Sequence, residues 1–124
     1  MTINIPFSKI FFTSVIFSFV IILTPLAQAE QNDQTIILKQ EVHNNPNNPV
    51  AYYNLGDMYV KQEEYKMATK ALQQAIQINP NYAEAFYLIG RAYGNMDEFK
   101  KSRDAFNRAI AINPDYAEAY LKLG

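Results

Sequence analysis

Residues 78–90 read INPNYAEAFYLIG, and residues 112–124 read INPDYAEAYLKLG. The two stretches lie 34 positions apart and are nearly identical. Repetition at a period in this range is typical of proteins built from stacked units, each of which is too small to bury its own apolar side chains. The two stretches therefore predict a repeat architecture for this part of the chain.

The repetition extends well beyond these two stretches, because residues 49–82 align with residues 83–116 without a gap. Each residue of the following set has an identical counterpart 34 positions later: Ala51, Tyr53, Gly56, Tyr59, Glu64, Lys66, Ala71, Ala75, Ile76, Ile78, Asn79, Pro80 and Tyr82. The alignment predicts two full copies of one unit.

The apolar residues of each unit have helical spacing. In the first unit Tyr52, Leu55 and Tyr59 follow steps of three and four residues, and Ala68 and Leu72 lie four residues apart in a second such run. Steps of this kind place side chains on one face of a helix. Each unit is therefore predicted to be a helical hairpin, with its internal turn near residues 62–64.

Prolines and polar residues mark the ends of the predicted helices. Pro80 and Pro114 should end the second helix of each unit, because proline lacks the backbone N–H and disfavours helical geometry in the residue before it. Pro49 is suited to a first helical turn. Asn81 and Asp115, each followed three residues later by glutamate, are expected to cap the next helices.

The two units resemble the tetratricopeptide repeat, whose pattern is an aromatic residue, Leu-Gly, Tyr, Ala, an aromatic residue or Leu, Ala and Pro. The matching positions, which the resemblance assigns to packing, are Tyr52, Leu55, Gly56, Tyr59, Ala68, Leu72, Ala75 and Pro80, then Phe86, Ile89, Gly90, Tyr93, Ser102, Phe106, Ala109 and Pro114. Glu63 and Asp97 stand where the family usually has glycine, and Ser102 replaces an alanine. The small residues should let the two helices approach closely.

The predicted fold is all-α, a short right-handed α-solenoid of antiparallel helical hairpins. Ile37, Leu38 and Val42 could cover the open side of the first hairpin. The expected divisions are a signal peptide at 1–29, a lead-in with a lone capping helix of a half-repeat at 30–48, the first repeat at 49–82, the second at 83–116, and the start of an incomplete third repeat at 117–124, which matches the family at Tyr120, Leu123 and Gly124.

The N-terminal segment is typical of a secretory signal peptide. Lys9 precedes the apolar run of residues 10–23, Pro25 interrupts it, and Ala27-Gln28-Ala29 has the small-x-small form of a cleavage site. The run is shorter than the roughly 20 residues that span a membrane, so we expect cleavage after Ala29 and export to the periplasm or the exterior. The alternative is an uncleaved segment that anchors the protein in the membrane.

The composition argues against catalysis, metal binding and nucleic-acid binding. The chain has no cysteine, a single histidine (His43), and 11 basic against 12 acidic residues. Zinc ligands and a catalytic base are therefore not expected, and neither is any cofactor. The basic residues of 100–108 are interleaved with acidic ones, which favours a solvated helix face over a nucleic-acid site.

The resemblance implies a function in binding proteins. In the family, the first helices line a concave groove that holds a partner's peptide; the matching residues are Tyr53, Asp57, Lys61, Tyr87, Arg91 and Asn95. The alternative for Tyr53 and Tyr87 is packing between neighbouring hairpins. One branch of the family holds a terminal carboxylate with lysines and asparagines, but this chain has Tyr53, Asp57 and Leu88 at the matching places, so that mode is not expected.

The sequence therefore predicts an exported adaptor that binds a protein or peptide partner and performs no chemistry. Alternatives are a self-associating assembly factor that uses an uncapped C-terminal edge, and a fragment of a larger repeat protein.

Overall fold

The computed structural model describes residues 7–118 and residue 121, with side chains from Pro25 onward. The helices are α1 (Phe7–Asn44), α2 (Pro49–Lys61), α3 (Tyr65–Ile78), α4 (Ala83–Asn95) and α5 (Phe99–Ile112). The chain divides into two compact units, Met1–Ile36 and Ile37–Gly124. The described residues contain no strand, and the fold is an all-α solenoid, as predicted.

The first unit consists of α1 up to Ile36, and the helix continues through Pro25 and Ala29 without a break. Among the described residues, no helix is both long enough and apolar enough to cross a membrane. Residues 1–6 lie outside the described residues. The signal peptide of residues 1–29 remains a prediction.

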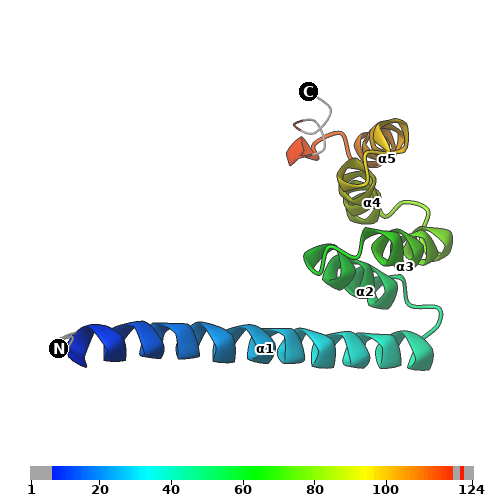
Figure 1. The fold of residues 1–124 in the computed structure, drawn as a ribbon. Helices are drawn as coiled ribbons and strands as arrows, with labels where there is room; N and C mark the ends of the chain where they lie inside the picture. Colours follow the sequence, from blue (N-terminus) through cyan, green and yellow to red (C-terminus); the bar gives the residue numbers. More distant parts are fainter. Residues whose placement is uncertain (1–6, 119–120, 122–124) are drawn as a thin grey trace. The chain divides into compact units, whose positions relative to one another are not determined.

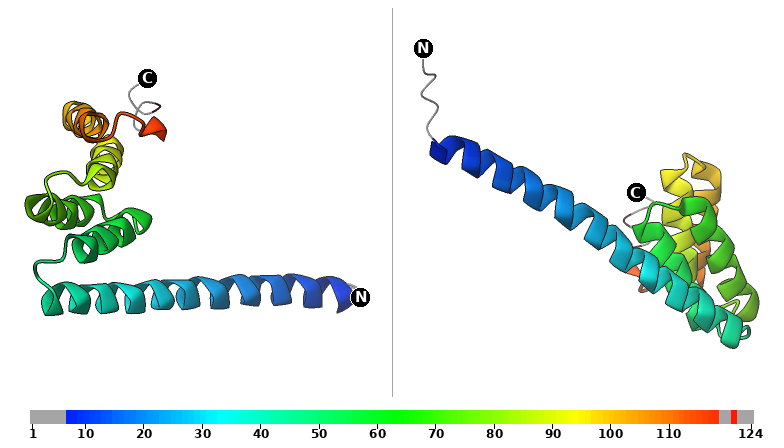
Figure 2. Two further views of the ribbon diagram at one scale, coloured as in Figure 1. Left: turned by 180° about the vertical axis from the view of Figure 1, so that it is seen from behind. Right: turned by 60° about the horizontal axis from the view of Figure 1, so that its bottom comes forward.

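The second unit contains two antiparallel helix pairs, α2 with α3 and α4 with α5 (Figure 1). The first pair contacts the second mainly through α3 and α4, and to a lesser extent through α2 and α4. Two further views show the same order of α2 to α5 along the stack (Figure 2). The internal turns lie at residues 62–64 and 96–98, between the ends of α2 and α4 and the starts of α3 and α5.

The second helix of each repeat ends just before its proline, as predicted. The residues that form the turn after it differ from those expected. α3 ends at Ile78 and α5 at Ile112, two residues before the prolines. The Asn79 and Asn113 side-chain oxygens accept hydrogen bonds from the backbone N–H groups two residues later, at 3.1 and 3.2 Å. The expectation that Asn81 caps the next helix was wrong, because Tyr82 holds the N-cap position of α4 and makes no side-chain cap bond.

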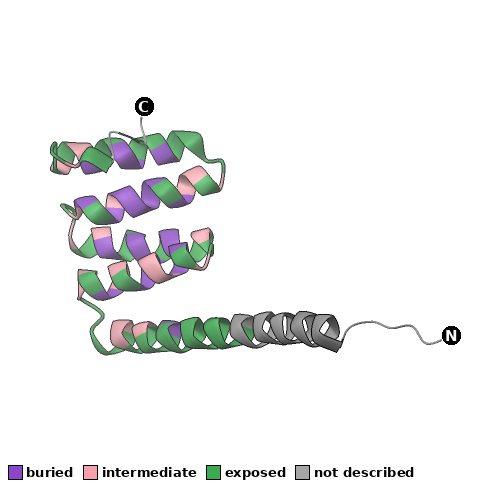
Figure 3. Cartoon of the chain, turned by 90° about the vertical axis from the view of Figure 1, so that its left-hand side faces the viewer, coloured by how far each residue is buried: buried purple, intermediate pink, exposed green. Residues whose placement is uncertain are grey.

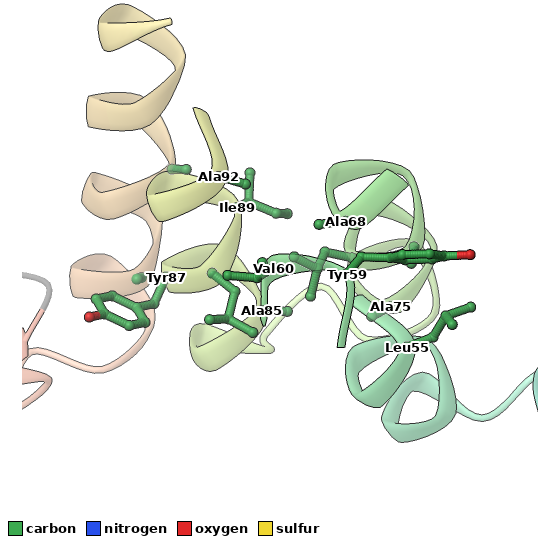
Figure 4. Close-up of a cluster of buried hydrophobic side chains, with 14 of the residues drawn as sticks. Leu55, Tyr59, Val60, Ala68, Ala75, Ala85, Tyr87, Ile89 and Ala92 are labelled. Atoms are coloured by element: carbon green, nitrogen blue, oxygen red, sulfur yellow. The ribbon is translucent and has the colours of Figure 1, made fainter. Parts of the chain in front are cut away.

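Small and aromatic side chains form one continuous core between the helix pairs. Buried positions face the neighbouring helices along α2 to α5 (Figure 3). Ala68, Ala75, Ala85 and Ala92 are fully buried, and the close-up shows them with larger neighbours such as Ile89 (Figure 4). Alanine at these positions lets the helix axes approach, while larger residues fill the space between them.

Gly56 and Gly90 mark the closest approach within each helix pair. A Cβ atom added at Gly56 would lie 2.5 Å from Leu72 Cγ, and one at Gly90 would lie 2.7 Å from Phe106 Cε1. Contacts this short do not occur between real side-chain carbons, so each glycine is required by the packing. The close approach of the two helices that the repeat pattern predicts is therefore present in both helix pairs.

The departure from the family pattern at Ser102 has a structural explanation. The buried Ser102 hydroxyl donates a 2.7 Å hydrogen bond to the backbone carbonyl of Gly90, which joins α5 to α4. A hydroxyl is therefore accommodated at an alanine position because its proton has an acceptor on the facing helix.

Both internal turns use a residue in the left-handed backbone region. Glu63 has φ of 61° and Asp97 has φ of 59°. These are the two positions where the family usually has glycine. A side chain with a Cβ atom is strained in this region, whereas glycine adopts it without a steric penalty.

Replacing Glu63 with glycine is expected to raise the free energy of unfolding by about 0.5 to 1 kcal/mol, because the relief of strain exceeds the entropy that glycine adds to the unfolded chain. Urea denaturation of the full chain would measure the change. Glu64→Gly is the matched control, since Glu64 has φ of −83° and gains nothing from glycine. Equal effects in the two variants would contradict the explanation.

The two ends of the repeat array differ. Leu38 and Val42 in the last turns of α1 pack against the core. Ile37 was expected to do the same but is 64% exposed. At the other end, helical backbone resumes at residue 117. The positions Tyr120, Leu123 and Gly124 of the expected third repeat lie outside the described residues.

Candidate functional site

Four tyrosines of the second compact unit lie close together, on α2, on α4 and in the turns that follow α3 and α5. The Tyr53 ring stacks on Tyr82, with centroids 5.1 Å apart, and the Tyr87 and Tyr116 rings meet nearly at right angles, with centroids 5.3 Å apart. Tyr53 is among the groups that raise the pKa of Tyr116, after burial and Glu118, so the two pairs are neighbours. We call Tyr53, Tyr82, Tyr87 and Tyr116 the tyrosine surface.

The residues of the tyrosine surface recur with the same 34-residue period as the rest of the repeat. The pair Tyr87 and Tyr116 is the pair Tyr53 and Tyr82 displaced by 34 residues, and each pair is accompanied by a glutamate, Glu84 or Glu118. Sequence reasoning missed Tyr82, Tyr116 and both glutamates as candidate site residues. Their signal was present, because all four belong to the stretches in which the chain repeats itself.

The six residues predicted to line a groove have different surroundings. Lys61 Nζ forms an exposed ion pair with Asp57 Oδ2 at 2.7 Å. The Arg91 guanidinium lies over the Tyr87 ring, 5.9 Å from its centroid, and the exposed Asn95 side chain donates to the Arg91 carbonyl at 2.9 Å. Arg91, Asn95 and Lys61 are therefore available to a partner at the surface.

The two tyrosines of the predicted groove are buried to different degrees. Tyr53 is half-buried, whereas Tyr87 is only 8% exposed and packs against Phe106 at a centroid distance of 5.7 Å. Tyr87 therefore helps to hold α4 against α5, which is the packing role left open by the sequence.

The environment of the tyrosine surface raises the pKa of all four hydroxyl groups. Burial is the main cause in each case. The Glu118 carboxylate accepts a hydrogen bond from the Tyr87 hydroxyl and further raises its pKa. The pKa of Tyr116 rises to about 12, with contributions after burial from Glu118, Tyr53, Glu84 and Tyr87.

This environment predicts a loss of stability at high pH. The Tyr116 hydroxyl ionises near pH 10 when exposed and near pH 12 in the fold, so the folded chain holds this proton more tightly. The free energy of unfolding should be unaffected by this group below pH 10 and should fall as the pH rises towards 12. Urea denaturation across this range should show a smaller fall for Tyr116→Phe. An identical fall in both proteins would contradict the prediction.

The second helix pair, α4 and α5, has an exposed aromatic residue at the start of α5. Phe99, at the start of α5, is 69% exposed. It lines a hollow together with Gly90, Arg91, Gly94, Asn95, Ser102 and Phe106. Phe106 and Ala109, further along α5, are buried in the core. The apolar exposure here is therefore concentrated in Phe99.

Among the side chains that the structure describes, no three His, Asp or Glu residues gather closely enough to hold a metal ion. The His43 side chain is exposed near the end of α1.

Two sequence models of repeat families match the chain. One, described as a TPR repeat, covers residues 56–97, and the other, described as a tetratricopeptide repeat, covers residues 83–116. The chain belongs to the tetratricopeptide-repeat family. The matched ranges contain Gly56, Gly90, both internal turns and the inter-unit turn that carries Tyr82. A comparison with curated protein sequences found no match.

Solved structures of tetratricopeptide-repeat domains share this fold. A crystal structure of MamA is 35% identical, with a TM-score of 0.72 over 75% of this chain and 54% of the MamA chain. The chain thus spans about half the length of MamA. The first such domain of Spaghetti (RPAP3), bound to the HSP90 peptide SRMEEVD, is 19% identical, with a TM-score of 0.74 over 79% of this chain and 78% of that domain.

The second domain of human RPAP3, in complex with the HSP70 peptide SGPTIEEVD, is also 19% identical. Its TM-score is 0.73 over 79% of this chain and 82% of that domain. At this identity the two RPAP3 domains establish likeness of fold only.

Proposed function

We propose that this chain is an exported adaptor whose repeats bind a segment of a partner protein along α2 and α4, without catalysing a reaction. The observation that carries the proposal is that two domains of the same fold hold a peptide. Membership of the repeat family supports a protein-interaction scaffold at the coarser level. A preformed surface of rigid helices favours such binding, because little of the scaffold has to be ordered on association.

The chemistry of the surface supports the proposal. Tyrosine rings offer contact area at a low cost in side-chain entropy, and their hydroxyls can bind polar groups. Arg91 and Asn95 are exposed on α4 beside the tyrosine surface, and Lys61 is exposed on α2. A partner segment could therefore contact rings and polar groups together.

The binding surface can be tested with a variant that leaves the core intact. Arg91→Ala combined with Asn95→Ala is expected to weaken binding of a partner segment at least tenfold, since both side chains are exposed and Tyr87 is left unchanged. Segments would come from a peptide array that covers proteins captured by the full chain from the exported compartment. Affinity would be measured by fluorescence anisotropy in a mild non-ionic detergent.

The matched control for this variant is Lys66→Ala combined with Gln74→Ala, two exposed residues of α3. Thermal unfolding of both variants should match that of the parent chain. Equal affinities of both variants for the segment would place binding elsewhere on the protein.

Export is proposed from the N-terminal sequence. N-terminal sequencing of the protein recovered from the exported fraction is expected to begin at Glu30. A mature chain that retains residues 1–29 in the membrane fraction would instead favour the anchored alternative.

Self-association through the edge at Phe99 is a second candidate function. It is favoured by the exposure of this large apolar side chain next to the Gly94 hollow. Sedimentation of the full chain should then show a concentration-dependent oligomer that Phe99→Glu dissociates. A monomer at all concentrations would reject this candidate without affecting peptide binding.

A further inference from the structure

We propose that the tyrosine surface recognises a cationic segment, with a lysine or arginine side chain of the partner seated on the rings between Glu84 and Glu118. This inference rests on the proposed function and specifies the chemistry of the partner. It follows from the position of the rings, from the charges around them and from the cations that the chain already places on its own aromatic residues.

The rings provide a site for a cation. Tyr53 and Tyr82 stack on each other, Tyr87 and Tyr116 meet nearly at right angles, and Tyr53, Tyr82 and Tyr116 are each only half-buried. The negative face of an aromatic ring attracts a lysine or arginine side chain within about 6 Å of the ring centre. Three half-buried rings from neighbouring turns and helices form a larger platform than one ring alone.

The carboxylates beside the rings have no cationic partner in the described part of the chain. The ion pairs found there are Lys61 with Asp57 and Lys101 with Glu98, and neither includes Glu84 or Glu118. Both glutamates are exposed and near the tyrosine hydroxyls. After burial, the carboxylates of Glu118 and Glu84 are among the causes that raise the pKa of Tyr116, so both carboxylates lie close enough to act on this ring.

Two basic side chains beside the tyrosine surface, those of Lys61 and Arg91, already have contacts within the chain. Lys61 is paired with Asp57. Arg91 lies over Tyr87 and acts on that ring, but it is not among the groups that influence Tyr116. Among the described residues, no basic side chain forms an ion pair with Glu84 or Glu118.

Cation–π contacts of the kind inferred here already occur within the chain at other aromatic rings. Lys101 Nζ lies 5.4 Å from the centre of the Tyr93 ring, and Arg108 Cζ lies 5.5 Å from the centre of Phe86. A cation from a partner would make the same kind of contact at Tyr53, Tyr82 and Tyr116, with the added attraction of two carboxylates.

The inferred partner differs in charge from the peptides held by the RPAP3 domains, both of which end in Glu-Glu-Val-Asp. An acidic tail on this surface would meet Glu84 and Glu118, neither of which is paired with a lysine among the described residues. Like charges brought together at an interface reduce affinity and exclude partners of the wrong sign. The surface therefore selects against an acidic segment.

Charge preference can be measured with a display library of random peptides presented to the full chain in a mild non-ionic detergent. We expect the selected sequences to be enriched in lysine and arginine and depleted in aspartate and glutamate. One selected peptide would then be titrated against Glu84→Gln combined with Glu118→Gln, which removes both charges and preserves side-chain size. The expected loss of affinity is about tenfold.

The matched control is Glu64→Gln combined with Asp104→Asn, which changes the net charge equally at exposed sites outside the tyrosine surface. Its affinity should stay within about twofold of the parent value. Equal losses in the two variants would overturn the assigned position. Selection of acidic or uncharged sequences would overturn the cationic preference and leave peptide binding in place. If no peptide were selected, peptide binding and the inference would both be rejected.

Discussion

Replacing Phe106 with alanine is expected to lower the free energy of unfolding by about 3 to 5 kcal/mol. The Phe106 side chain is 4% exposed and packs against Tyr87 and the backbone at Gly90. Its removal loses buried apolar area and leaves a cavity that the rigid helix pair can only partly close. Tyr87 also loses a ring contact, so damage should spread to the tyrosine surface.

The matched control is Phe99→Ala, which removes the same side chain from the same helix. Phe99 is 69% exposed, so we expect a change within about 0.5 kcal/mol. Urea denaturation of the full chain, followed by circular dichroism, would measure both. Similar losses for Phe99 and Phe106 would show that α5 does not pack against α4 in the manner described.

Replacing Gly90 with alanine is expected to destabilise the fold by about 1 to 2 kcal/mol. The new methyl group would lie within 3 Å of the Phe106 ring, and the steric cost exceeds the gain of about 1 kcal/mol that alanine offers over glycine in a helix. Gly94→Ala is the control, because its added Cβ meets only the Ser102 hydroxyl oxygen at 3.4 Å. That variant should be neutral or slightly stabilising.

The Gly90 effect should change sign when Phe106 is absent. In a Phe106→Ala background the clash is gone, and only the helix preference for alanine remains, so Gly90→Ala should then stabilise the chain. Denaturation of the single and double variants completes the cycle. Additive effects would show that Gly90 and Phe106 are not in contact.

Much of the repeat could be predicted because local chemistry determines it. Pro80 and Pro114 disfavour continuation of the helix before them, and α3 and α5 do end two residues before them. The glycine positions were also predictable, because close approach in each hairpin requires a residue without a side chain. Ser102 was predicted to pack, but its acceptor on Gly90 could not be read from the sequence.

The tyrosine surface was harder to predict because it depends on contacts between helices and between the two repeats. Tyr87 was assigned to a groove, yet burial against Phe106 and Tyr116 depends on how α4 meets α5 and the following turn. Asn81 was expected to cap α4, but its backbone N–H donates to the Asn79 side chain and Tyr82 holds the N-cap position. Only the turn geometry decides which asparagine bonds a nearby backbone N–H. The repetition of Tyr82 and Tyr116 was visible, but their pairing with Tyr53 and Tyr87 required the fold.

The most direct test of the account is to map the bound segment on the protein by NMR. The measurement is the change in backbone amide shifts of the full chain in detergent micelles when a library-selected peptide is added. We expect the largest changes in amide shift on α2, on α4 and on the turn that carries Tyr82. Changes confined to the exposed faces of α3 and α5 would contradict it.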